Sequence, residues 1–197
     1  MEINNERYIG DVGVYNEPLF HDDRGTFIPT KMDHHNIQTN ISINVKAHTF
    51  RGMHLQIGEF AQSKRLKVLS GNIIDFYVNL IPSKDYGRVG FLRMGPGDVI
   101  VVPRGYAHGF LTMCDNVYVQ YLVDNEYNQE ADRSINYKSF PLIQQLITNV
   151  GCTHEIQISS KDGNAPILDQ FKSGKKRNQN KPEDIFGFKM YESTSRT

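Results

Sequence analysis

Residues 97–112 read GDVIVVPRGYAHGFLT, and no other stretch of the chain says as much about the fold. After Asp98, the apolar run VIVV (99–102) is followed at once by a Pro-x-Gly turn, at Pro103 and Gly105, and then by His108. Proline fixes its own backbone φ and glycine can take positive φ, so together they let the chain reverse sharply. A run that is apolar at every position is typical of a strand covered on both faces. We therefore predict a buried strand, a tight turn and a returning strand that points His108 inward.

The residues around this stretch, 41–123, are also strand-like. Short runs of Ile, Val, Tyr and Phe are broken there by Gly, Pro, Asn and Asp,. In 71–80 one face holds Ile74, Phe76, Val78 and Leu80, and the other holds Ile73, Asp75, Tyr77 and Asn79. This alternation predicts a strand that packs on one side and lines a pocket on the other. Helical spacing occurs only near 33–37 and 140–150, so we expect an all-β barrel or sandwich with a few short helices.

Functional side chains are concentrated in RGMHLQIGEFAQSKRLKV, residues 51–68. This segment contains Arg51, His54, Gln56, Gln62 and Lys64. The 97–112 stretch resembles the second motif of the cupins. The 51–68 segment resembles the signature of the dTDP-4-dehydrorhamnose 3,5-epimerase family, in which an Arg-Gly-x-His-x-Gln strand is followed by a lysine ten residues after the histidine. His54 and Lys64 have that spacing.

The resemblance covers about residues 8–171. It includes FHDDRGTF (20–27), QTNIS (38–42), GNIIDF (71–76), PRGYAHGF (103–110), the pair Tyr121 and Tyr127, and SKDGNAPILDQ (160–170). Membership of this family implies a cupin double-stranded β-helix, or jelly-roll, barrel in residues 1–171. Residues 172–197 are then a charged, flexible C-terminal tail.

The resemblance also implies a reaction and roles for four residues. Inversion of a carbon beside a ketone needs a base, a group that stabilises the oxyanion, and an acid on the opposite face of the ring. His54 would be the base and Lys64 the oxyanion stabiliser, with help from His108. Tyr121 would be the acid, because a phenol can donate a proton to the carbanion-like carbon. No cofactor is implied.

The substrate would be a nucleotide-linked 4-keto-6-deoxy sugar. Arg51, and Arg24 from a neighbouring subunit, would hold its diphosphate through their forked donors. Asp75 would orient Lys64 or His108, and Tyr127 would stack on the ligand or pack locally. The implied substrate-binding set is Arg24, Gln38, Arg51, Gln56, Asp75 and Tyr127.

One expected group is missing from its place. The family pairs its base with an aspartate twelve residues after the position of Tyr127, and here that position holds Ser139. A carboxylate beside a histidine fixes the tautomer and stabilises the imidazolium. Asp132 is the nearest replacement by sequence. Two alternatives therefore stay open beside double epimerisation: an epimerase that acts at a single carbon, and a non-catalytic sugar-nucleotide-binding protein.

A metal-dependent cupin is the remaining alternative. Its ligands would be His48, His54, Glu59 and His108. Oxygen-using cupins usually have a His-x-His pair, but Gly52 stands two residues before His54, and Lys64 would put a positive charge beside the cation. We therefore expect no metal site.

Composition limits the other functions. The 22 basic and 22 acidic residues give no net charge, so no overall field attracts nucleic acid or a membrane,. Two cysteines, Cys114 and Cys152, are too few for a disulfide framework,. No leader or membrane-spanning stretch is evident. We expect a cytoplasmic homodimer, with the dimer, formed by exchange of the N-terminal strand, implied by the family alone.

Overall fold

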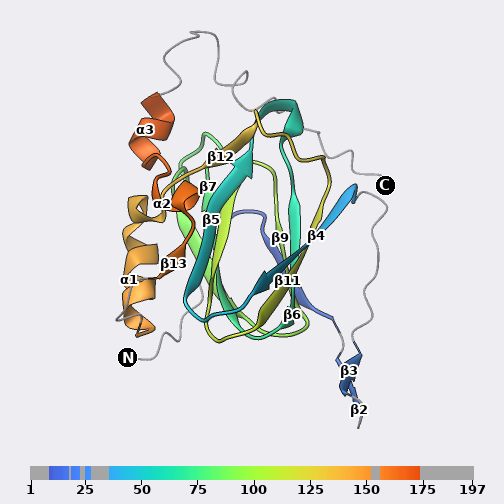
Figure 1. The fold of residues 1–197 in the computed structure, drawn as a ribbon. Coiled ribbons are helices and arrows are strands. Elements are labelled where there is room, and N and C mark those ends of the chain that lie inside the picture. Colours follow the sequence, from blue (N-terminus) through green and yellow to red (C-terminus); the bar gives the residue numbers. More distant parts are fainter. Residues whose placement is uncertain (1–8, 18, 23–24, 28–35, 152–155, 174–197) are drawn as a thin grey trace.

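The computed structural model describes residues 9–17, 19–22, 25–27, 36–151 and 156–173. Antiparallel strands are the main secondary structure of the described chain, and two sheets of them form a jelly-roll barrel (Figure 1). The first sheet has the order β1-β9-β6-β11-β4. Its strands are β1 (Gly13–Asn16), β4 (Gln38–Asn44), β6 (Lys64–Ser70), β9 (Asp98–Val102) and β11 (Val117–Val123).

The second sheet has the order β12-β5-β10-β7-β8, and β13 pairs with β5 in parallel. Its strands are β5 (Thr49–Gln56), β7 (Ile73–Asn79), β8 (Val89–Met94), β10 (Tyr106–Thr112), β12 (Asp132–Ser134) and β13 (Gln157–Ile158). A separate hairpin of β2 (Phe20–Asp22) and β3 (Gly25–Phe27) extends away from the barrel (Figure 1). The predicted all-β cupin fold is confirmed.

The helical segments are short, and all of them except η1 follow the last long strand, β11. They are η1 (Gly58–Phe60), η2 (Tyr137–Ser139), α1 (Pro141–Asn149), α2 (Ser160–Gly163) and α3 (Leu168–Ser173). The helix expected near 140–150 is confirmed as α1, with Pro141 at its first position, where the missing N–H has no intrahelical partner to lose,. Of the segment expected to be helical near 33–37, residues 33–35 lie outside the described part. No helix in the described residues is long and apolar enough to span a membrane.

Two apolar clusters fill the molecule. One lies inside the barrel and includes Leu66, Tyr77, Ile100, Phe110 and Val119. The other lies on the outer face of the second sheet, where Ile143, Leu146 and Ile147 of α1 cover strand residues such as Phe76 and Val78. Strand β7 is therefore buried on both faces. The predicted apolar face packs towards α1, but the opposite face is mostly barrel interior rather than pocket wall.

The strands β5 and β10 approach unusually closely at two glycines. A Cβ on Gly52 would lie 2.6 Å from the Cα of Gly109, and a Cβ on Gly109 would lie 2.6 Å from the Arg51 carbonyl oxygen. Gly52 also has a φ of +130°, which side-chain-bearing residues rarely adopt,. The register shifts at this point, between His108 and Phe110, and leaves His54 directly opposite His108. The close contact thus places the two histidines side by side.

The C-terminal boundary predicted at residue 171 falls inside α3, which ends at Ser173. Residues 174–197, most of the predicted tail, lie outside the described part of the chain.

Candidate active site

A cavity of about 630 Å³ opens between the two sheets and is lined in part by residues of α2. Its wall combines residues of β4, β5, β6, β10, β11, β12 and β13 with the loop after β11 and with α2. The polar lining residues are Asn40, Ser42, Thr49, Arg51, His54, Gln56, Gln62, Lys64, His108, Tyr121, Tyr127, Asp132, Gln157, Ser159, Lys161 and Asp162. All four residues predicted to be catalytic therefore face one cavity.

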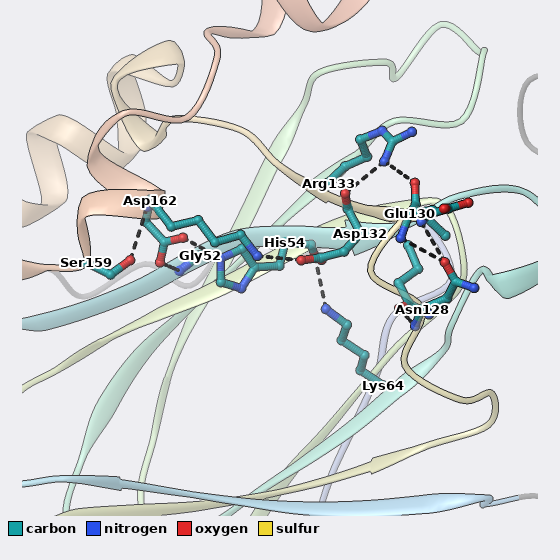
Figure 2. Close-up of polar contacts among 12 residues, drawn as sticks. Gly52, His54, Lys64, Asn128, Glu130, Asp132, Arg133, Ser159 and Asp162 are labelled. Atoms are coloured by element: carbon teal, nitrogen blue, oxygen red, sulfur yellow. Dashed lines mark hydrogen bonds and ion pairs between the residues drawn. The ribbon is translucent and has the colours of Figure 1, made fainter.

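His54 has a carboxylate partner. Its Nε2 lies 2.6 Å from Oδ1 of Asp162, which belongs to α2 (Figure 2). The other carboxylate oxygen accepts from the Gly52 amide at 3.3 Å, and the Asp162 amide donates to the Ser159 hydroxyl at 3.1 Å. Burial alone would raise the pKa of Asp162, but the hydrogen bond and charge of His54, with the bonds from Gly52 and Ser159, bring it below its ordinary value,. Asp162 is thus held in its ionised form.

The ionised state of Asp162 also decides the tautomer of His54. A carboxylate only accepts hydrogen bonds, so Nε2 of His54 must donate. The lone pair then lies on Nδ1, which is the atom able to take a proton. The His54 side chain keeps 33% of its surface exposed, whereas that of Asp162 keeps 5%. The base is open to the cavity and its carboxylate is sheltered.

The sequence-based assignment of this carboxylate was wrong. Ser139 does not reach His54, and its hydroxyl instead accepts a hydrogen bond from the Leu168 amide at 2.9 Å. Asp132, the proposed replacement, forms an ion pair with Lys161. Asp162 is 108 residues from His54 in sequence, and simple counting from Tyr127 could not find it. The available signal was the 160–170 stretch, which matches the family but was not assigned a role.

Lys64 lies beside His54 on the neighbouring sheet. Its ammonium donates to the backbone oxygen of His54 at 3.0 Å. Burial lowers the pKa of Lys64 to about 8, against the opposing charges of Asp132 and Asp75,. A cation is therefore present in the cavity at neutral pH, where it can stabilise a developing oxyanion.

His108 forms a second histidine–aspartate pair, deeper in the barrel. Its Nε2 lies 2.8 Å from Oδ2 of Asp75, and their side chains are 2% and 0% exposed. Burial raises the pKa of Asp75, although His108 and Lys64 act in the opposite direction. Of the two expected partners of Asp75, the structure places His108 in direct contact. Asp75 itself does not line the cavity.

Tyr121 projects from β11 into the cavity and packs against Phe110, with ring centroids 6.3 Å apart. Burial raises the pKa of the phenol far above its ordinary value, and the Asp75 charge adds to this while Arg51 opposes it. The hydroxyl therefore carries its proton at any physiological pH and can donate it.

The predicted substrate-binding residues divide into three groups. Arg51 and Tyr127 line the cavity, and Arg51 Nε donates to the Asn44 side chain at 2.6 Å. Gln56 also lines the cavity, but its amide is engaged with backbone groups. Gln38 is not part of the wall and donates to Asn40 at 2.7 Å instead. Arg24 lies outside the described residues.

Sequence reasoning also missed Lys161, whose ion pair with Asp132 crosses from α2 to β12. Of the four ligands of the alternative metal site, only His54 and His108 face the cavity. His48 and Glu59 are not among the lining residues. The four side chains are therefore not gathered into one centre in the described structure.

Comparison with known proteins gives a consistent result. The family model described as dTDP-4-dehydrorhamnose 3,5-epimerase matches residues 6–170. The protein of that name from Escherichia coli (strain K12) is 30% identical over 175 residues, which cover 82% of this chain and 92% of that protein.

Solved structures show the same relationship. A dTDP-4-dehydrorhamnose 3,5-epimerase from Bacillus anthracis, with TDP and PPi bound, aligns with a TM-score of 0.68 and 27% identity. The alignment covers 80% of this chain and 94% of the other. A dTDP-6-deoxy-D-glucose-3,5-epimerase from Legionella pneumophila has a TM-score of 0.73 at 22% identity, covering 86% of this chain and 94% of the other, which shows a shared fold.

Proposed function

Because the chain belongs to the dTDP-4-dehydrorhamnose 3,5-epimerase family, we propose that it inverts C3, C5 or both carbons of a nucleotide-linked 4-keto-6-deoxy sugar. The first substrate to test is the dTDP-linked sugar that the family name specifies. The observation that carries this proposal is the His54–Asp162 contact at the wall of a cavity that also holds Lys64 and Tyr121.

The reaction begins with removal of a carbon-bound proton next to the ketone. Nδ1 of His54 takes the proton, and the C–H electron pair moves into an enolate whose negative charge rests on the former ketone oxygen. Asp162 stabilises the imidazolium that results, and Lys64 stabilises the oxyanion,. Because the Lys64 ammonium is already held in place, it need not reorient as the negative charge develops, and such stabilisation is therefore effective.

The second half of the reaction returns a proton to the same carbon from the opposite face. Tyr121 is the donor, since its phenol is fully protonated. The enolate collapses to the ketone as the new C–H bond forms. Solvent then reprotonates the tyrosine and takes the proton from the His54 imidazolium. Proton loss and gain balance, so no redox partner is required.

The nucleotide portion would occupy the open side of the cavity. Arg51 would bind the diphosphate, together with Arg24 of a neighbouring subunit. Tyr127 stands at this opening with 58% of its surface exposed. Its ring is placed to contact the part of the ligand that extends beyond the sugar pocket.

The position of Asp162 bears on the alternative functions that the sequence left open. The non-catalytic alternative depended on the absence of a carboxylate beside His54, and Asp162 provides one. Single-carbon epimerisation uses the same residues. It differs from double epimerisation only in that the hydrogen of one carbon, C3 or C5, exchanges with solvent. Metal analysis of the purified protein tests the metal-dependent alternative.

Solvent exchange tests the function directly. The protein is incubated in deuterated water with dTDP-4-keto-6-deoxyglucose, and incorporation is followed by mass spectrometry and NMR. Label at C3 and C5 supports double epimerisation, and label at one carbon supports the single reaction. His54→Ala is the matched control, and exchange in that variant at the wild-type rate would remove His54 from its role. No exchange with any nucleoside-diphosphate 4-keto sugar would leave a binding protein.

We also propose that two copies associate through the outer face of the first sheet. Ile41 and Ile43 on edge strand β4 are 62% and 60% exposed, and Tyr118 lies beside Ile43 on β11. Large exposed apolar side chains gathered on one sheet face usually mark a protein interface. The hairpin β2–β3, which extends from the barrel, could reach a second copy (Figure 1). Analytical ultracentrifugation of wild type and Ile43→Lys tests this, with a monomeric wild type as the contrary result.

A cytoplasmic location remains part of the proposal. Cys114 is a free thiol, which suits a reducing compartment,. Cell fractionation tests it.

A further inference from the structure

The loop between β11 and β12 carries Tyr127 to the opening of the cavity. It contains no helix or strand of its own, so its position depends on individual hydrogen bonds. Side-chain amides supply many of them. Asn128 Oδ1, for example, accepts from the Glu130 and Ala131 amides at 2.9 and 3.0 Å (Figure 2).

Gln56 ties this loop to the catalytic strand. It is the last residue of β5, two positions after His54, and is 4% exposed. Its amide nitrogen donates to the Glu126 oxygen at 2.9 Å and to the Phe60 oxygen at 2.7 Å. Its amide oxygen accepts from the Asn128 amide at 2.7 Å. Gln56 therefore binds the backbone on both sides of Tyr127.

These bonds leave Gln56 with no free donor. A glutamine amide has two N–H groups, and both are used,. A direct contact with a sugar or phosphate oxygen would require breaking one of them, which would leave a buried carbonyl unpaired. The position of Gln56 in the cavity wall thus fits a supporting role better than the substrate contact expected from the sequence.

We propose that Gln56 is a positioning residue that holds Tyr127 at the cavity opening and so sets the affinity for the nucleotide. The proposal rests on the function proposed above in one respect, that the ligand of Tyr127 is a nucleoside diphosphate. Gln56 and His54 lie two residues apart on the same strand, β5. The position of the loop is therefore fixed relative to the base.

A double-mutant cycle separates this role from direct contact. Binding of dTDP is measured by calorimetry for wild type, Gln56→Met, Tyr127→Ala and the double variant. We expect each single change to weaken binding about tenfold and the double variant to match Tyr127→Ala alone. With the keto-sugar substrate, KM should rise about as much in Gln56→Met, while kcat changes less than about threefold. Additive losses in the double variant would overturn the proposal.

Gln62→Met is the matched control. Gln62 is also a glutamine of the cavity wall, but its amide makes a single bond to the loop, to the Asn125 oxygen at 2.7 Å. Its replacement should change dTDP affinity less than about twofold, because the backbone on either side of Tyr127 stays bound. A loss equal to that of Gln56→Met would show that general disturbance of the cavity wall, and not the hold on Tyr127, is responsible.

Hydrogen exchange tests the structural step without any activity. The Asn128 amide should exchange about tenfold faster in Gln56→Met and remain at the wild-type rate in Tyr127→Ala. Gln56→Glu is the second variant, for use if Gln56→Met does not fold. It keeps the oxygen that accepts from the Asn128 amide but loses both N–H donors. The Asn128 amide should therefore stay protected from exchange, while the Glu126 oxygen loses its hydrogen bond. Unchanged exchange at Asn128 in Gln56→Met, or full dTDP affinity in a folded Gln56→Glu, would overturn the proposal. If wild type binds no dTDP, the proposed function fails, and the exchange rates still decide the role of Gln56 in holding the loop.

Discussion

Two histidine–aspartate pairs in the described part of the chain differ in their surroundings. His54 is 33% exposed and meets Asp162 from a short helix late in the chain, whereas His108 is 2% exposed and meets Asp75 from the adjacent strand. Asp162 uses both carboxylate oxygens, one for His54 and one for the Gly52 amide. Asp75 uses one, and its Oδ1 has no hydrogen-bond partner among the described residues.

These surroundings move the two carboxyl groups in opposite directions. The pKa of Asp162 lies below its ordinary value because hydrogen bonds outweigh burial, while the pKa of Asp75 lies above it because burial dominates. The same two residue types thus form a pair suited to proton exchange with the cavity and a pair suited to holding structure. Burial and hydrogen-bond count, not residue identity, separate the two roles.

The largest expected effect is on the open pair. Asp162→Asn keeps the shape of the side chain but removes the charge that stabilises the His54 imidazolium, so we expect deuterium incorporation to slow about 10³-fold. Ser139→Ala is the control for the position that sequence counting assigned, and it should exchange within about twofold of wild type. Equal losses in the two variants would contradict the assignment of Asp162.

Lys64, which bonds to the backbone oxygen of His54 and is influenced by the charge of Asp75, gives the next effect, on pH dependence. The rate should fall about tenfold per pH unit above about 8, because the ammonium that stabilises the oxyanion is then lost,. The unfolded chain keeps this proton up to about 10.5, so the contribution of Lys64 to the free energy of unfolding should increase between pH 8 and 10.5,. Rate profiles and urea titrations of wild type and Lys64→Met measure both. A rate that is constant from pH 7 to 10 would rule out this role.

The buried pair should affect stability more than catalysis. Asp75→Leu leaves His108 without its partner in a closed environment, so we expect the free energy of unfolding to fall by about 2 kcal/mol. Asp75→Asn retains a hydrogen-bonding group and should lose less than half as much. Urea unfolding compares them with Asp162→Asn, which should change by less than about 1 kcal/mol. Asp75→Leu with wild-type stability would mean that the two pairs do not differ in this way.

The smallest effect concerns the ion pair at the cavity opening. Lys161 is 59% exposed, so its bond with Asp132 should contribute less than about 1 kcal/mol to stability,. Asp132 also favours the charged form of Lys64. Asp132→Asn should therefore move the alkaline fall in rate to lower pH by a few tenths of a unit, with little change in rate at pH 7. A shift to higher pH would contradict this charge arrangement.

Parts of the site followed from short stretches of sequence. The turn at Pro103 and Gly105 reflects local backbone geometry, whereas the ten-residue spacing of His54 and Lys64 is the signature of the family that the chain resembles. The cavity wall includes His108, which follows the turn, and both His54 and Lys64. The contact of Asp75 with His108 was also within reach, because the two residues lie on paired strands. Gln38 shows the limit of this reasoning. It shares a strand face with Asn40 and Ser42, but the cavity ends before reaching it.

Alternation and turn residues predicted an all-β barrel or sandwich, because such patterns act over a few residues. The resemblance to the family predicted the inward histidines and the cation beside them. The identity of the carboxylate at His54, and the use of Gln56 as a support for Tyr127, depended on how distant segments pack. Asp162 meets His54 only because α2 and β5 come together across 108 residues of chain, and spacing along the sequence contains no measure of that distance in space.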